Sequence, residues 1–127
     1  MPLSVNVHEK QSGSYVVSPV GSIDSLTYVD LEQAVDPVLA SSPRVVVLNF
    51  SGVDYVSSRG ISVIFKIKKA VEGGGGSFLM TDLQPQIKKV FEIIRALPSM
   101  NIFSSEEEAD AYLAEMQRRA LEGGEEA

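Results

Sequence analysis

Residues 45–61 read VVVLNFSGVDYVSSRGI, a stretch that joins an apolar run to a polar turn and to the beginning of an amphipathic segment. Positions 45–48 are apolar without alternation, which is typical of a central strand that is covered on both faces. The polar part predicts a connecting loop over residues 49–59. Ser57 and Ser58 stand where the next helix begins, so the side-chain oxygen of either one can cap its first free amides.

Alternating and helical spacings of apolar residues on both sides of this stretch predict the other elements. Strands are expected at residues 5–8, 15–17 and 77–80, with a short edge strand at residues 101–103. Helices are expected over residues 28–39 and 61–71, from Pro85 to Pro98, and onward from the capping residues Ser104 and Ser105. Asp24 or Ser25 is expected to cap the first of these helices.

The order of these elements indicates the fold class. A hairpin followed by alternating helices and strands favours an α/β domain with a mostly parallel sheet and helices packed on it. The 127 residues, 44% of them hydrophobic, suit a single domain across residues 1–127. Its core is expected over residues 3–120, and the acidic, glycine-containing tail at residues 121–127 is expected to be disordered.

Composition narrows the classes of function. Cysteine is absent, which excludes disulfides and thiolate metal sites and suits the reducing cytoplasm. The formal net charge of -6 opposes a nucleic-acid partner, and no apolar run is long enough for membrane insertion. His8 is the one histidine, and no residues stand at metal-ligand spacing. The sequence therefore predicts a protein that is bound rather than an enzyme, with no catalytic residue, metal or cofactor.

The same stretch, residues 45–61, resembles the signature of STAS domains, the family named for sulfate transporters and anti-sigma-factor antagonists. Residues 21–24, with the sequence GSID, are similar to a second landmark of that family before its first helix. Later positions that follow the family's order are the glycine-rich turn, residues 78–80, Pro85, residues 90–92 and residues 105–109. The resemblance implies a mixed sheet of about five strands, with its first strand antiparallel and four helices packed mainly on one side.

Among STAS proteins, the chain is similar to the stand-alone members that act as anti-sigma-factor antagonists in the cytoplasm. The resemblance implies a partner that is both an anti-sigma factor and a serine kinase, and a separate serine phosphatase that resets the switch. Alignment on Gly60 brings Ser58 onto the serine that is phosphorylated in this family, with Ser57 as the alternative acceptor. The chain departs from the usual pattern at Ser57, Arg59 and Ser62, where the family commonly has aspartate, serine or threonine, and glycine.

These residues predict a partner-binding surface around the beginning of the second helix. Its expected members are Asp24, Asp54, Ser57, Ser58, Arg59 and Ser62. Arg59 could pair with a phosphate, whereas Asp24 and Asp54 could equally serve as cap and turn residues. The alternative function is a STAS scaffold module that uses the same surface without phosphorylation, in a signalling assembly or a transporter complex.

Overall fold

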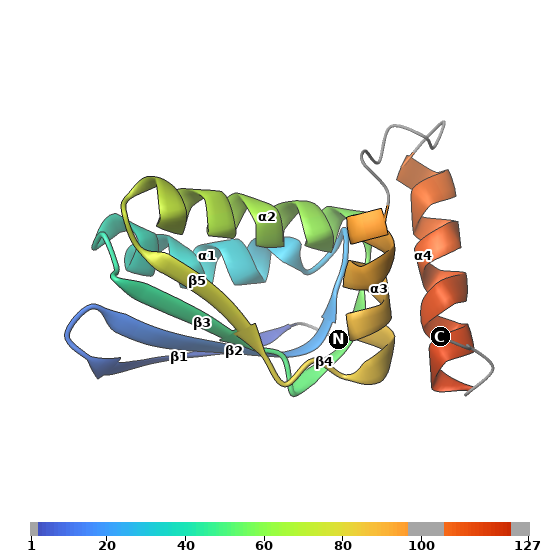
Figure 1. Ribbon diagram of the computed structural model, residues 1–127, viewed down its shortest axis with the longest axis horizontal. Coiled ribbons are helices and arrows are strands. Elements are labelled where there is room, and N and C mark those ends of the chain that lie inside the picture. Colours follow the sequence, from blue (N-terminus) through green and yellow to red (C-terminus); the bar gives the residue numbers. More distant parts are fainter. Residues whose placement is uncertain (1–2, 97–105, 123–127) are drawn as a thin grey trace.

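The computed structural model describes residues 3–96 and 106–122 of the chain. This part of the chain forms five strands and four helices. Figure 1 shows how they are arranged. In chain order the elements are β1 (Ser4–Gln11), β2 (Ser14–Ile23), α1 (Tyr28–Ala40), β3 (Val45–Asn49), β4 (Gly52–Val56), α2 (Ser58–Gly73), β5 (Ser77–Thr81), α3 (Pro85–Ala96) and α4 (Glu106–Leu121). The expected α/β class, the hairpin and the helix that begins at Pro85 are confirmed.

The sheet is mixed, as the family resemblance implies. β1 pairs with β2 antiparallel through a tight turn in which Gly13 adopts a φ of 82°, a conformation that favours glycine. The remaining pairs are parallel, and the order is β1-β2-β3-β5 with β4 attached to β2. The ten-residue β2 is long enough to pair with β3 through its first half and with β4 through its second half.

The expectation of a loop over residues 49–59 is wrong, because β4 lies within it. Gly52 pairs with Val20, and a Cβ on Gly52 would lie 2.9 Å from the Val20 Cγ2 atom and 3.3 Å from the Pro19 carbonyl oxygen. The edge strand expected at residues 101–103 and the capping serines at residues 104–105 lie outside the described residues.

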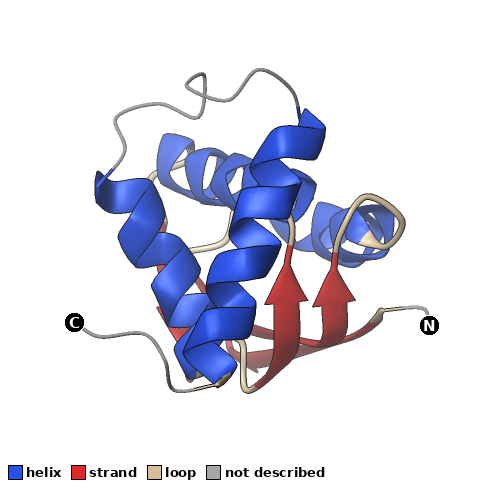
Figure 2. Cartoon of the chain, turned by 90° about the vertical axis from the view of Figure 1, so that its right-hand side faces the viewer, coloured by secondary structure: helices blue, strands red, loops and turns tan. Residues whose placement is uncertain are grey.

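One face of the sheet is covered by α1 and α2, while α3 and α4 lie side by side at the end where β4 is found (Figures 1 and 2). The core forms between the sheet and these helices, with Val17, Leu48 and Phe50 among its fully buried members. On the other face, Val16, Val47 and Leu79 form a row across three strands, and Leu79 is 52% exposed. The described helices therefore cover the central strand on one face, rather than on both faces as predicted.

Side-chain amides of α3 and α4 occupy the hydrogen-bonding edge of β4 that no strand covers. The Gln117 side chain is 2% exposed, and its Oε1 atom accepts from the Val56 amide at 3.1 Å. Its Nε2 atom donates to the carbonyls of Val56 and Leu113, both at 3.0 Å. Gln86 donates to the Asp54 carbonyl at 3.1 Å in the same way. Glutamines thus replace a neighbouring strand and fix the position of α4 against β4.

Replacing Gln117 with alanine is expected to lower the free energy of unfolding by about 2–4 kcal/mol. The substitution leaves both the amide and the carbonyl of the buried Val56 without their side-chain partner, and each such group costs about 1–3 kcal/mol. Urea unfolding followed by circular dichroism measures the change. The exposed Gln33 on α1 provides the control, since Gln33→Ala should change stability by less than about 0.5 kcal/mol. Equal effects of the two substitutions would contradict the assignment.

Candidate functional site

The first residues predicted for the site lie in the turn between β2 and α1. The Asp24 Oδ1 atom accepts from the amides of Leu26 at 2.9 Å and Thr27 at 3.1 Å. The Thr27 hydroxyl in turn donates to the Ser22 carbonyl at 2.6 Å. The Asp24 carbonyl also accepts from the amide of Tyr28, the first residue of α1, at 3.0 Å. Thr27, which directly precedes the helix, makes no side-chain cap hydrogen bond, so the expected capping role of Asp24 is confirmed.

Ser57 is the N-cap residue of α2. Its backbone is extended, with φ of -91° and ψ of 177°, and its Oγ atom accepts from the Gly60 amide at 3.3 Å. The Ser57 amide donates to the Ile23 carbonyl at 2.9 Å, which joins the beginning of α2 to the end of β2. The Ser57 residue is only 3% exposed. Its hydroxyl therefore already has a structural function inside the protein.

Ser58 is the first residue of α2 and is partly exposed. The backbone amides of a helix's first turn and the helix dipole together favour negative charge at this position. The Arg59 guanidinium carbon lies 5.1 Å from the centroid of the Tyr28 ring, a cation–π contact that joins the beginnings of α1 and α2. Ser62 lies four residues after Ser58, about one helical turn, and is exposed.

Gly60 allows the first turn of α2 to approach the ends of two strands. A Cβ on this residue would lie 2.6 Å from the Ile23 carbonyl oxygen, 2.9 Å from the Ile23 Cγ2 atom and 3.0 Å from a Val56 methyl group. Real Cβ atoms do not approach backbone oxygen atoms so closely, so a side chain here would have to displace the helix. The position of Ser58 relative to the sheet therefore depends on a glycine.

The remaining predicted residue, Asp54, lies exposed on β4. Its Oδ1 atom accepts from the Ser22 hydroxyl at 2.8 Å. Because the Ser22 carbonyl also accepts from Thr27, Ser22 links Asp54 to the turn that holds Asp24. The structure thus brings the predicted residues to one end of the sheet, where β2 and β4 end.

Sequence reasoning did not single out Ser22, Tyr28 or Leu26 for this site. Ser22 lies within the GSID motif, but only the fold shows that its hydroxyl reaches Asp54. Tyr28 matches the helical core pattern, whereas its ring also contacts Arg59. Leu26 is 84% exposed beside Asp24, and a single apolar residue in a turn carries no periodic signal.

The chemistry of this end of the sheet suits anion acceptance and protein contact. Among the residues that the structure describes, no group of three or more His, Cys, Asp or Glu residues is placed to hold a metal ion. On α4, hydrogen bonds from Arg118 and Arg119 lower the pKa of Glu115. Within the same described residues, no helix is both long enough and apolar enough to span a membrane.

The fold and this site define a STAS domain. The model of the STAS domain family matches residues 5–109, which is most of the chain, and the chain belongs to that family. A curated relative from Bordetella bronchiseptica, named "Putative anti-sigma factor antagonist BtrV", is 28% identical over 103 residues, covering 81% of this chain and 89% of the relative.

Solved structures share the fold at lower identity. An anti-sigma factor antagonist from Mycobacterium paratuberculosis is 24% identical, with a TM-score of 0.66 over 79% of this chain and 89% of that one. SpoIIAA in its unphosphorylated form is 14% identical, with a TM-score of 0.60 over 71% of this chain and 83% of that one. SpoIIAA of Bacillus in its phosphorylated form gives a TM-score of 0.61 at the same identity, over 72% of this chain and 83% of that one.

Substitution of Gly60 with alanine is expected to lower the free energy of unfolding by about 1–3 kcal/mol. Alanine normally stabilises a helix interior relative to glycine by about 1 kcal/mol, but here overpacking against Ile23 outweighs the gain. Gly73, in the same helix, is the matched control, because a Cβ there meets no atom within 4 Å. Chemical denaturation should show a loss for Gly60→Ala and no loss for Gly73→Ala. A stabilised Gly60→Ala protein would show that the close approach is not required.

Proposed function

We propose that this chain is a cytoplasmic anti-sigma factor antagonist whose binding is switched off by phosphorylation of Ser58. The partner is an anti-sigma factor with serine-kinase activity, and a separate serine phosphatase restores the binding form. The observation that carries the proposal is the division of roles at the beginning of α2, where Ser57 is a buried cap and Ser58 is partly exposed. Family membership and the antagonist names of its relatives support the same function.

The environment of the two serines favours Ser58 over Ser57 as the acceptor. A kinase would have to expose Ser57 and break its hydrogen bond to the Gly60 amide before transfer. Phosphate on Ser57 would also have to fit in a position that is 3% exposed. Ser58 precedes Arg59, whose guanidinium could turn from the Tyr28 ring to the phosphate.

The transfer step needs only a nucleophile from this protein. The Ser58 oxygen would attack the γ-phosphorus of ATP, and a new O–P bond would form as the bond to the β-phosphate oxygen breaks. ADP leaves, and the hydroxyl proton passes to a base on the kinase. This chain is thus the substrate of the reaction and its partner is the enzyme.

The physical basis of the switch is charge at an interface. A phosphoserine carries about -1.5 to -2 charges at neutral pH, and the N-terminus of α2 tolerates this charge in the free protein. In a complex, an uncompensated charge that is removed from water costs several kcal/mol, and each 1.4 kcal/mol weakens binding about tenfold. The exposed residues Asp54 and Ser62 and the half-buried residues Asp24 and Arg59 lie at the same end of the sheet as Ser58 and are proposed as partner contacts.

Phosphorylation of Ser58 can be tested by incubating the chain with candidate serine-kinase anti-sigma factors and ATP and locating phosphate by mass spectrometry. We expect phosphate on Ser58, no labelling of Ser58→Ala, and retained labelling of Ser57→Ala despite a stability loss of about 1 kcal/mol from the missing cap. Calorimetric titration should show that Ser58→Ala binds the partner as the unmodified chain does. Ser58→Asp should bind at least tenfold more weakly.

Different failures of this experiment have different meanings. Phosphate on Ser57 alone would overturn the residue assignment and keep the switch. Binding to an anti-sigma factor without phosphorylation by any kinase would favour the scaffold function, in which the same surface binds constitutively. Absence of binding to every candidate would overturn the proposed function itself.

The exposed side chain of Leu26 provides a second test of the surface. Leu26 is 84% exposed beside Asp24, so Leu26→Ser should leave stability nearly unchanged while removing an apolar contact. We expect partner binding to weaken about tenfold in calorimetric titration. Leu121 at the end of α4 is 65% exposed, and Leu121→Ser is the matched control that should bind normally. Equal affinity of the two variants would show that Leu26 is not part of the partner-binding surface.

A further inference from the structure

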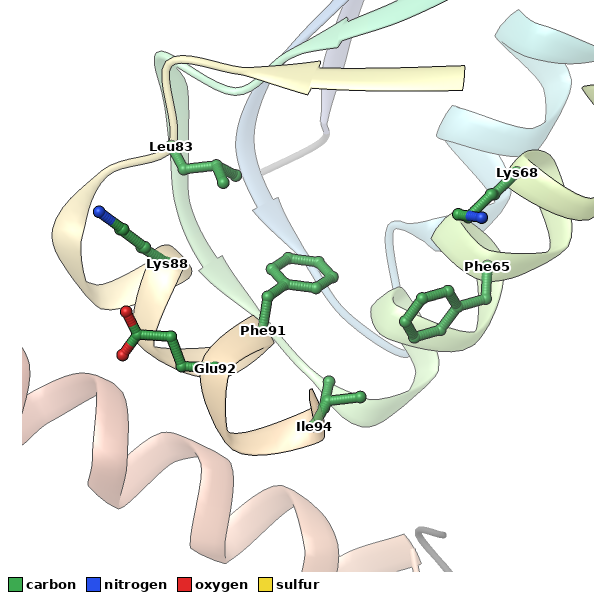
Figure 3. A pocket seen from close by; sticks show the side chains of 7 residues that line it. All are labelled: Phe65, Lys68, Leu83, Lys88, Phe91, Glu92 and Ile94. Carbon is green, nitrogen blue, oxygen red and sulfur yellow. The ribbon is translucent and has the colours of Figure 1, made fainter. Parts of the chain in front are cut away.

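A groove of about 480 Å³ lies between α2 and α3, away from Ser58. We call it the α2–α3 groove, and its main lining residues are Phe65, Lys68, Leu83, Lys88, Phe91 and Ile94. Figure 3 shows that Phe65 from α2 and Phe91 and Ile94 from α3 point toward one another, with Leu83 beside Phe91. The groove is thus built from two helices and the segment that precedes α3.

The floor of the groove is apolar and aromatic. The rings of Phe65 and Phe91 meet edge to face, with centroids 6.2 Å apart and an angle of 79° between planes. Phe65 remains 41% exposed. The volume lies within the range of about 300–1,000 Å³ that is usual for small-molecule sites. An apolar body of drug-like size would therefore cover aromatic surface that is now in contact with water.

Two lysines, Lys68 and Lys88, and one glutamate, Glu92, line the groove, whereas the chain as a whole is acidic. α2 and α3 together hold seven of the eleven Lys and Arg residues and two of the seventeen Asp and Glu residues, and two of these seven basic residues line the groove. The Lys68 Nζ atom lies 2.9 Å from both carboxylate oxygens of Glu72, and an ammonium group has a third N–H to donate. Lys88 forms no ion pair with another residue in the described part of the chain.

We propose that the α2–α3 groove binds an amphiphilic anion, a molecule with an apolar or aromatic body and one carboxylate or sulfonate head group. The body would pack on Phe65 and Phe91, and the head group would lie near the ammonium groups of Lys68 or Lys88. Because the chain carries a formal net charge of -6, two lysines beside an apolar surface make this groove the more favourable place for an anion. This site is independent of the function proposed for Ser58.

One residue of the lining carries a negative charge that should weaken the binding of an anion. Substitutions in the groove can therefore be expected either to strengthen or to weaken binding. Glu92 lies on α3 one turn after Lys88 and contributes a negative charge to the wall. Its removal should strengthen binding of an anion, whereas removal of a lysine should weaken it. A site that binds by hydrophobic contact alone would respond to neither change.

The test uses the full chain with 8-anilinonaphthalene-1-sulfonate as a fluorescent probe and decanoate as the competitor. We expect saturable binding of one probe per chain, displaced by decanoate at least tenfold more effectively than by the uncharged 1-decanol. Thermal unfolding measured in parallel establishes that the probe binds the folded protein. Loss of probe fluorescence on unfolding is the expected result, and an increase would indicate binding to unfolded chains and overturn the proposal.

Matched variants assign the binding to the groove. Phe65→Ser should weaken decanoate binding about tenfold, and Lys68→Ala and Lys88→Ala should each weaken it about three- to tenfold. Glu92→Gln should strengthen decanoate binding about twofold or more, and none of these charge changes should alter the affinity for 1-decanol by more than twofold. The controls are Leu79→Ser, which removes a similarly exposed apolar side chain from the open face of the sheet, and Lys10→Ala, which removes the one lysine outside α2 and α3.

Two results would overturn this proposal. The first is binding of the probe that all these variants leave unchanged, because the ligand would then lie elsewhere. The second is no measurable binding of probe or decanoate, and weaker binding of Phe65→Ser to the anti-sigma factor would then assign the groove another occupant. The groove would in that case be a docking surface for an acidic protein segment.

Discussion

The approach of α2 to the ends of β2 and β4 is the constraint on which the rest of the site depends. Gly60 lies against Ile23 with no room for a side chain, and the Ser57 amide binds the Ile23 carbonyl. This close approach buries the cap residue and leaves the next residue, Ser58, at the surface. The same contact aligns the beginning of α2 with the beginning of α1, so that Arg59 reaches Tyr28. The surface around Ser58 is therefore assembled by backbone packing rather than by flexible side chains.

The sequence predicted the beginning of α2 well because several local signals agree there. A serine pair followed by a glycine and a helical apolar pattern identifies a capped helix, and the family resemblance pointed to the same serines. The sequence did not decide between Ser57 and Ser58 as the exposed residue. That difference depends on how closely the first turn of α2 packs against the ends of β2 and β4, which is a property of the tertiary structure.

The sequence did not predict β4, and the burial pattern of this strand gives the physical reason. Val53 and Val56 are both buried although they stand three residues apart, which is not the alternation expected of a strand. The register shifts between Gly21 and Ser22, so that Gly21 pairs with Val53 and Ser22 pairs with Tyr55. The shift leaves Asp54 outside the ladder and hides the two-residue period. The glutamines that cover the other edge of β4 come from distant helices and leave no local signal.

The two proposed sites lie at different positions along α2, and the distance between them limits their electrostatic coupling. Ser58 and Lys68 are ten residues apart, which corresponds to about 15 Å along a helix axis. This distance exceeds the Debye length of about 8 Å at physiological ionic strength, so a phosphate on Ser58 would exert little electrostatic effect on an anion in the α2–α3 groove. Coupling between the sites would require a movement of α2 as a body. The packing of Gly60 against Ile23 opposes such a movement, and the two sites should therefore bind their partners independently.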